Sequence, residues 1–458
     1  MEITDKELQT SPIHSLFRKY FYPTLGGMLA VSLVTVTDGI FVGNGVGADG
    51  VAAVNLVWAP LMLFVGLGLM LGMGSSVAAS IALAKGDVIT ARRHVTQSMI
   101  FGFLTVSFVV SVMFISPAAT VRILGASDTL TGVSVEYLVY ILPGFLFDIF
   151  AMIGLFVLRV DGNPKLAMWC TLLRALVNII LDYVLIFPLG MGIKGAAIAT
   201  SLSYVVGAAV VLVYLTGYAR SLRLLNPINP ASWKGWLNNL WLQCKIGVSG
   251  MLGEGVMALT MFLGNIMTMK YLGDAGVGAF GLICYYLPFV FLVGNSIAQG
   301  AQPIISFNYG YGDFQRMKST ERVAIKTAIT SGLTMGALFM FGKYPLTDIF
   351  LPVESTSGNI AVSAFPYYSL CALPYIFNIT SIGYFQSIGK VAPSVVFSLL
   401  RGPVFLIPSF LLLPPTIGVT GIWIALAISE LLTAACICAY YWTHHNKPNP
   451  DVNHNKSL

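Results

Sequence analysis

Five acidic residues stand inside long apolar runs of this sequence, where a charged side chain is costly. They are Asp38, Asp148, Asp182, Glu254 and Glu430. A charge placed at the centre of a bilayer is rare, and such residues usually mark an ion or substrate pathway. A shielded carboxylate can bind a proton, or a hard cation such as Na⁺ that prefers oxygen ligands. The acids therefore indicate ion-binding chemistry inside an apolar protein.

Two of these acids share one depth with an amide and a hydroxyl group. Asp38 and Asp182 each lie about six residues before the outer end of their apolar run, and Asn178 stands one helical turn before Asp182. Thr200 lies about seven residues into the next run. At 1.5 Å per residue, all four groups lie roughly 10 Å below the outer surface. We predict that Asp38, Asn178, Asp182 and Thr200 form a site for H⁺ or Na⁺, because burial and a neighbouring like charge both favour a protonated or cation-bound carboxyl group.

An internal repeat provides a control for this site. At an offset of 226 or 227 residues, the second half carries no acid at the positions that match the four site residues. A purely architectural group would more naturally appear in both halves, so we place the cation site in the first half alone. A static polar cluster that braces the helices is the alternative interpretation. The matching positions are Gly264, Phe405, Ser409 and Leu426.

The repeat spans nearly the whole of each half of the chain. GIKGAAIA at 192–199 matches GVTGIWIA at 418–425, and LLR at 172–174 matches LLR at 399–401. Six spans per half are an even number, so both halves have the same orientation in the membrane. This is a parallel repeat about an axis along the membrane normal, as in some secondary transporters. The matched glycine pairs include Gly47 with Gly273, Gly86 with Gly312, and Gly162 with Gly389.

Twelve apolar runs must position these groups, and each is long enough to cross a bilayer, for which about 20 residues suffice. Hydrophobic residues make up 56% of the 458 residues and charged residues 10%, against about 25% charged in a soluble domain. We predict an all-α polytopic membrane protein with twelve transmembrane helices in two pseudo-symmetric six-helix bundles, because helices satisfy their own backbone groups in lipid. The runs fall at about 20–43, 52–84, 94–116, 134–160, 166–188, 193–218, 241–270, 276–308, 321–343, 357–388, 392–413 and 418–442.

Lysine and arginine residues set the expected orientation. With the N-terminus placed in the cytoplasm, 19 of the 25 fall in cytoplasmic segments and four in outer segments. We therefore expect both termini to be cytoplasmic, in a multi-pass protein of the bacterial inner membrane with a retained first helix. The remaining two, Arg174 and Arg401, match each other in the repeat and are interpreted as architectural.

The predicted organisation has three parts. Residues 1–222 form an N-terminal six-helix lobe that holds the cation site, 223–240 a cytoplasmic linker, and 241–458 a C-terminal six-helix lobe. The stripe of Trp233, Trp236, Leu237, Leu240 and Trp241 predicts a short helix in the membrane interface. The alternative is that this stripe is the start of the seventh transmembrane helix.

Three other residues carry hypotheses about transport. Asp148 and Glu254 lie near the middle of their helices, where each either faces a substrate cavity and attracts cations or is a structural hydrogen bonder. Pro23 removes one backbone hydrogen bond from the first helix, fifteen residues before Asp38. A kink there either lets the outer part of this helix move with the protonation of Asp38 or is static.

Several strings in this sequence resemble the MATE family (multidrug and toxic compound extrusion transporters), and most closely its prokaryotic DinF-like branch. They include TDGIFVG with the following GADGVAAVN at 37–55, LRVDGNPKLAM at 158–168, NIILDYVLIF with GIKGAAIATSLS at 178–203, and GAQPIISFNYG at 300–310. The resemblance covers about residues 15–440. It implies that Asp38, Asn178, Asp182 and Thr200 form the cation-linked site and that Pro23 is the kinking proline. Glu254 does not align cleanly with the acid of another branch, so that role is not carried over.

The resemblance implies export of amphipathic, often cationic compounds, driven by an inward H⁺ or Na⁺ gradient. A flippase for lipid-linked saccharides is the alternative, which the near absence of basic residues from the spans disfavours. The sequence has no HExxH, GxSxG or P-loop motif and its histidines lie at or outside span ends. We therefore expect neither catalysis, nor a cofactor, nor a metal site. Partners should be small-molecule drugs and the bilayer, with no nucleic acid, and the chain should act as a monomer.

Overall fold

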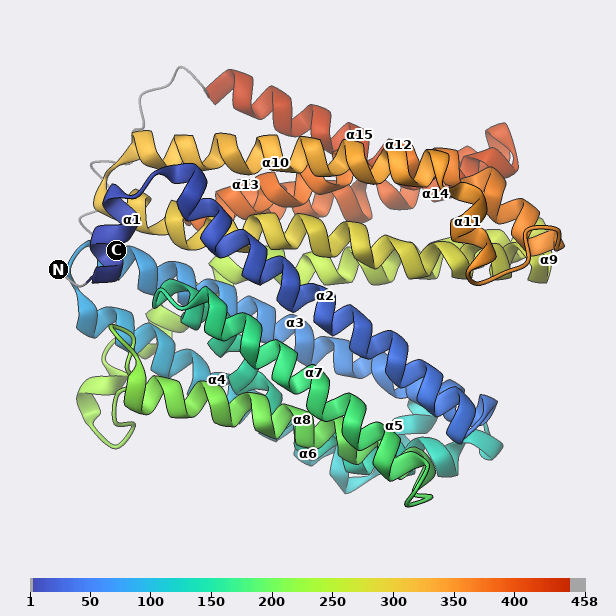
Figure 1. The fold of residues 1–458 in the computed structure, drawn as a ribbon, viewed down its shortest axis with the longest axis horizontal. Helices are drawn as coiled ribbons and strands as arrows, with labels where there is room; N and C mark the ends of the chain where they lie inside the picture. The colour runs from blue at the N-terminus through green and yellow to red at the C-terminus, as the bar shows by residue number, and fades with distance from the viewer. Residues whose placement is uncertain (1–2, 445–458) are drawn as a thin grey trace. The chain divides into compact units, whose positions relative to one another are not determined.

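The computed structural model describes residues 3–444, which form helices joined by short loops, with no strand in that stretch (Figure 1). The first half supplies six long helices, all of which are long and apolar enough to cross a membrane. Shorter helical segments lie before, between and after them. The elements are α1 (Ile3–Thr10), α2 (Ile13–Gly45), α3 (Ala48–Ala84), α4 (Val88–Ile115), α5 (Pro117–Ile123), α6 (Asp128–Val160), α7 (Pro164–Ile186), α8 (Gly192–Val213) and the π-turn η1 (Tyr214–Tyr218).

The second half supplies the other six spans, although its first two are continuous. Helix α9 (Trp236–Tyr311) has 76 residues and contains a break at Gly273, whose φ of 62° and ψ of −156° are not helical. A helix of that length is more than twice what one bilayer crossing needs, so α9 supplies two spans. Eleven candidate helices thus give the twelve predicted spans. The other elements are η2 (Pro230–Trp233), α10 (Phe314–Phe341), α11 (Lys343–Asp348), α12 (Thr356–Ser387), α13 (Val391–Leu399), η3 (Leu400–Val404), α14 (Leu406–Ile417) and α15 (Val419–His444).

The long helices begin up to seven residues before the predicted apolar runs, because their first turns are polar, and α4, α6 and α10 also have side-chain caps. The Asp87 carboxylate accepts a hydrogen bond from the Thr90 N–H at 2.9 Å, and Ser127 Oγ accepts one from the Leu130 N–H. In the second half, Asp313 repeats the Asp87 cap on the Arg316 N–H. Such caps satisfy N–H groups that a helix leaves free at its start.

Matched glycines show that the repeat extends to the backbone. Each member of four matched pairs has a positive φ at a turn between spans, a conformation that other residues adopt only under strain. The two halves therefore make equivalent turns at equivalent places. The pairs are Gly47 and Gly273, Gly86 and Gly312, Gly162 and Gly389, and Gly192 and Gly418.

The linker differs from the predicted interfacial helix. It contains only the single turn η2, and the backbone reverses at Gly235, where φ is 67°. Trp236 through Trp241 form the first turns of α9, as in the alternative interpretation, because the helix starts at Trp236 and is continuous through Trp241. The buried Asp161 carboxylate anchors the start of the linker, since it accepts hydrogen bonds from the N–H groups of residues 220, 221 and 222.

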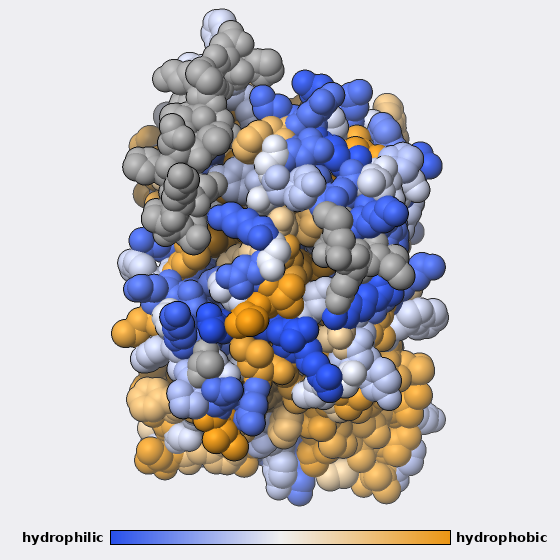
Figure 2. Space-filling view, turned by 90° about the vertical axis from the view of Figure 1, so that its left-hand side faces the viewer, coloured by the Kyte–Doolittle hydropathy of each residue, from blue (hydrophilic) through white to orange (hydrophobic). Residues whose placement is uncertain are grey.

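The chain forms two compact units that do not coincide with the two sequence halves. Unit 1 contains the residues up to 254 together with 295–324 and 383–391, and unit 2 contains 255–294, 325–382 and the residues from 392. One end of the second-half helices thus packs with the first half. We call this end of unit 1, formed by α1, the α3–α4 and α9–α10 turns and the linker, the α1 end. Figure 2 looks onto it and shows hydrophilic side chains gathered there, where the cytoplasmic loops are predicted.

Near the α1 end the two sequence halves cross at very short range. A Cβ added to Gly74 would lie 2.0 Å from the Gln243 carbonyl oxygen, and one added to the repeat-matched Gly300 would lie 3.0 Å from Phe21 Cα. Between these crossings, Ser76 Oγ lies 3.4 Å from Oε1 of Gln302, the residue that follows it by one repeat. Glycine at both crossings lets the helix backbones touch.

Candidate functional site

The four residues predicted to bind a cation all lie in unit 1, on three helices that pack together. Asp38 is on α2, Asn178 and Asp182 are on α7, and Thr200 is on α8. Asp182, Asn178 and Thr200 are 0%, 2% and 7% exposed. The Asn178 amide donates a hydrogen bond to Thr200 Oγ1 at 3.3 Å, so α7 and α8 meet as the spacing predicted.

The Asp38 and Asp182 carboxyl groups are neighbours, close enough for a hydrogen bond if one of them carries a proton. Both oxygens of Asp182, Oδ1 of Asp38 and Oδ1 of Asn178 are buried without a hydrogen-bond partner among the described residues. Buried polar atoms in folded proteins are nearly always satisfied. Four unsatisfied acceptor oxygens around two carboxyl groups fit a site that takes up a proton or a hard cation.

Tyr137 of α6 belongs to the same group of side chains, and the sequence did not reveal it. Its hydroxyl is buried beside the Trp58 side chain and lies within electrostatic range of both Asp38 and Asp182. A tyrosine in an apolar run is usually a core residue, so its type gives no signal. Only the packing of α6 on α3 and α8 identifies it as a member of the site.

Close helix crossings hold the acids together. A Cβ added to Gly45, at the C-terminal end of α2, would lie 2.2 Å from a side-chain carbon of Ile186 on α7. A Cβ on Gly195 of α8 would lie 3.0 Å from the backbone of Leu185. Pro23 is buried within α2, which stays helical from Ile13 to Gly45. Small residues at the ends thus set the distance between the three helices.

Asp148 is paired with a basic residue. It is 5% exposed and lies 2.5 Å from Nη2 of Arg174, which belongs to α7. Glu254 of α9 is partly exposed and forms no ion pair or hydrogen bond with the described residues. The two residues predicted to line a substrate cavity therefore differ, because one is neutralised by an arginine and the other is not.

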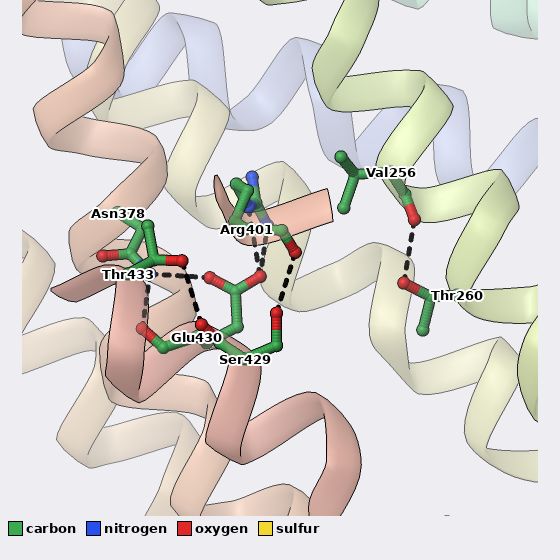
Figure 3. A network of polar contacts seen from close by, with 7 residues as sticks. All are labelled: Val256, Thr260, Asn378, Arg401, Ser429, Glu430 and Thr433. Atoms are coloured by element: carbon green, nitrogen blue, oxygen red, sulfur yellow. Dashed lines mark hydrogen bonds and ion pairs between the residues drawn. The ribbon is translucent and has the colours of Figure 1, made fainter. Parts of the chain in front are cut away.

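The fifth embedded acid, Glu430 of α15, forms the centre of a polar network in unit 2 (Figure 3). Its Oε1 accepts hydrogen bonds from Nε and Nη2 of Arg401, at 3.0 and 2.8 Å, and its Oε2 accepts one from the Asn378 amide at 2.7 Å. Glu430 is 0% and Arg401 2% exposed. The Glu430 charge is balanced by Arg401, so this network is suited to holding helices together.

A two-lobed bundle of twelve membrane spans, with an uncompensated pair of acids in the N-terminal lobe, defines the class of polytopic membrane transporters built from a parallel repeat. The sequence profile of the MatE family matches residues 23–184 and 252–411, one stretch in each half. The chain therefore belongs to the MATE family.

Relatives of known name cover nearly the whole chain. The chain is 25% identical over 446 residues to the multidrug export protein MepA of Staphylococcus saprophyticus, covering 95% of this chain and 94% of the relative. MepA of Staphylococcus haemolyticus is 24% identical over 453 residues, with the same coverage. The chain thus matches most of the length of these relatives.

Solved structures share the fold. An outward-facing multidrug resistance MATE family transporter of the MOP superfamily superposes with a TM-score of 0.89 at 23% identity, covering 97% of this chain and 98% of that one. A MOP superfamily transporter from Pyrococcus furiosus gives 0.87 at 23% identity, covering 96% and 97%. These likenesses confirm the twelve-span, two-lobed architecture.

Proposed function

We propose that this protein is a multidrug efflux antiporter of a bacterial cytoplasmic membrane, which exports amphipathic and often cationic compounds in exchange for inward H⁺ or Na⁺. The observation that carries the proposal is the Asp38–Asp182 pair, whose buried carboxyl oxygens have no partner among the described residues. The names of the MepA relatives support the substrate class. The MATE fold supports transport rather than catalysis.

Charge balance supports coupling in the N-terminal lobe. Asp148 and Glu430 are each neutralised by an arginine, whereas Asp38 and Asp182 face each other with no basic partner among the described residues. Two adjacent buried carboxylates repel each other, so a proton or a cation must bind to stabilise the pair. We expect H⁺, because close carboxyl groups readily share one proton.

Transport would proceed by alternating access, with the coupling cation entering from outside. Its binding at Asp38 and Asp182 would relieve the repulsion between α2 and α7 and favour release of the drug outward. Pro23 would supply the flexible point of α2 that this movement needs. Asp148, which is already paired, and Glu254 would take no part in cation exchange, although Glu254 remains free to attract a cationic drug.

The test is ethidium transport in proteoliposomes under an imposed pH gradient and, separately, an imposed Na⁺ gradient. Wild type should transport ethidium with one of the two gradients, which identifies the ion. Asp38→Asn and Asp182→Asn should each reduce gradient-driven transport at least about 100-fold, since the removed charge is the one that binds the ion. Thermal unfolding and insertion of the variants should match wild type.

The matched control is Asp128→Asn, which removes a carboxylate that is almost fully exposed at the start of α6. It should transport at the wild-type rate. Undiminished transport in both site variants would exclude the site. Absence of wild-type transport with either gradient would exclude the antiporter, and a lipid-scrambling assay would then test the flippase.

A further inference from the structure

Arg174 joins three helices of the N-terminal lobe. Its guanidinium is ion-paired with Asp148 of α6, and its Cζ lies 5.0 Å from the centre of the Tyr204 ring of α8. A Cβ added to Gly207 would lie 2.4 Å from Arg174 Cδ, so glycine at that position lets the side chain cross α8. The carboxylate and the aromatic face together hold one half-buried cation.

Arg401 has the same two kinds of partner in the C-terminal lobe. It is ion-paired with Glu430 of α15, and its Cζ lies 4.4 Å from the centre of the Tyr375 ring of α12. Each arginine is the last residue of an LLR string, and the two strings are 227 residues apart. Each lobe thus contains an arginine that lies between an acid and a tyrosine.

The acid and the tyrosine have exchanged helices between the lobes. Asp148 is followed by Ile-Phe, and so is its counterpart at an offset of 227, which is Tyr375. The counterpart of Tyr204, at the offset of 226 that aligns the GxxGxxIA strings, is Glu430. The charge-neutral group is therefore kept in both lobes, while the helix that supplies the carboxylate has changed.

Only the first copy of this group stands next to uncompensated acids. Arg174 lies one turn before Asn178 and two turns before Asp182 on α7, and Tyr204 is within electrostatic range of both the ion pair and Asp38. In the second copy, the positions that match Asp38 and Asp182 are Gly264 and Ser409. The C-terminal group can therefore brace helices but has no acid pair to influence.

We propose that Arg174 and Asp148 are positioning residues for the Asp38–Asp182 site, because they fix α7 against α6 and α8 and keep the local potential neutral where the cation binds. The proposal rests on the proposed function for its role in transport. The effect of Arg174 and Asp148 on the local potential at the acid pair does not depend on transport.

Tyr137 of α6 and Tyr204 of α8 lie within electrostatic range of the acid pair, and the neighbouring helices carry further ionisable groups. α6 supplies Tyr137 and Asp148, α8 supplies Tyr204 with Lys194 at its outer end, and α7 itself supplies Arg174. α3 carries only Asp49, at its outer end. Arg174 is the only cation of this set on α7, and eight residues place it roughly 12 Å along the helix from Asp182. At an effective dielectric constant of about 20, one unpaired charge at that distance shifts a carboxyl titration by about one pH unit.

The experiment follows the infrared band of the protonated carboxyl group with pH, in purified protein without Na⁺ or drug. The band is assigned by its loss in Asp182→Asn. Asp148→Asn leaves Arg174 unpaired, so the midpoint of the band should fall by about one pH unit. The double variant Asp148→Asn/Arg174→Gln removes both charges, and its midpoint should return to within about 0.3 units of wild type.

The matched controls are Glu430→Gln and Glu430→Gln/Arg401→Gln in the second copy. These should lower thermal stability without moving the midpoint, since no acid pair adjoins that group. Asp148→Ser replaces Asp148→Asn if the amide does not fold. An unmoved midpoint in the position-148 variant, with only a loss of stability as in the controls, would mean that the pair is a brace and would overturn the proposal.

The two proposals fail in different ways. If Asp148→Asn shifts the midpoint but the wild-type protein transports no ethidium, the positioning role is supported and the antiporter function is excluded. If ethidium transport depends on Asp182 but Asp148→Asn does not shift the midpoint, the antiporter function is supported and the positioning role of Arg174 and Asp148 is excluded.

Discussion

At the scale of single residues, the hydroxyl of Tyr137 is the group whose role is least evident from its type. It is buried near Asp38 and Asp182, with the Trp58 side chain as a further neighbour. A hydroxyl in that place can donate to a carboxylate oxygen when the cation leaves. It would then compensate part of the charge that the cation neutralised.

Tyr137→Phe should therefore change the apparent affinity for the coupling ion by about 3- to 10-fold, the value of one hydrogen bond of about 1 kcal/mol. Initial rates of ethidium transport against ion concentration would measure it. Tyr368→Phe is the control, because its hydroxyl is also buried but lies in unit 2. Equal effects of both substitutions would show that Tyr137 acts on stability alone.

The grouping of the candidate side chains was predictable where one helix carries the pattern and unpredictable where helices must meet. Asn178 and Asp182 share a face by spacing, and depth placed Asp38 and Thr200 beside them. No spacing reveals that Asp148 meets Arg174, because the two lie on different helices. The repeat contained a signal, since Tyr204 aligns with Glu430, but only the contacts show that this is an exchange.

At the scale of elements, a side-chain cap can fix the residue at which a span begins. Asp87 is such a cap at the start of α4. The hydrogen bonds from Thr90 hold the pKa of the Asp87 carboxyl below its usual value. A carboxylate with a lowered pKa stabilises the folded state at pH values above the unfolded pKa of about 3.9, and this contribution is lost as pH falls through the lowered pKa. The cap should thus protect the first turn of α4 at neutral pH and fail in acid.

Asp87→Ala should lower the opening free energy of that turn by about 0.5 to 1 kcal/mol at pH 7, at the lower end because the side chain is exposed. Below the lowered pKa of the Asp87 carboxyl, the variant and wild type should agree. Amide hydrogen exchange at Thr90 reports the difference. Asp49→Ala is the control, since no side-chain hydrogen bond caps the start of α3, and an equal loss in this variant would argue against the cap.

Span number and type followed from hydrophobic length, whereas boundaries did not. The apolar run cannot show that α2 starts at Ile13, because its first turns are polar. α5 and α11 were missed because seven and six residues carry too little periodicity. The tryptophan stripe of the linker was ambiguous, because the same spacing suits an interfacial helix and the start of α9.

At the scale of the whole molecule, unit 1 includes the ends of several second-half helices. These helix ends pack against the first half at the α1 end. Gly74 and Gly300 make the two crossings, and the repeat predicted that these glycines are equivalent without predicting what they touch. Because a Cβ on Gly74 would overlap the Gln243 carbonyl oxygen, Gly74→Ala must separate the two backbones. This substitution should open the α1 end.

A cysteine placed at Ser76, which is fully buried, reports this opening in a background without the native cysteines. With Gly74→Ala, we expect its labelling by an impermeant thiol reagent in inside-out vesicles to rise at least about 10-fold, as for an opening of roughly 1.4 kcal/mol. Gly132→Ala is the control, since nothing lies within 4 Å of its added Cβ. Labelling that stays at the control level would show that the crossing tolerates a methyl group.

The anchoring of the linker by Asp161 has a consequence for how the protein could be encoded. On one side the carboxylate holds residues 220–222, and on the other the Gln97 amide donates to the Ser232 carbonyl oxygen at 2.7 Å. Between these anchors Ile228 is 87% exposed. Severing the chain there would leave both new ends attached to unit 1, which already contains parts of both halves. Two separate genes, each supplying one half, would therefore suffice to assemble the same transporter.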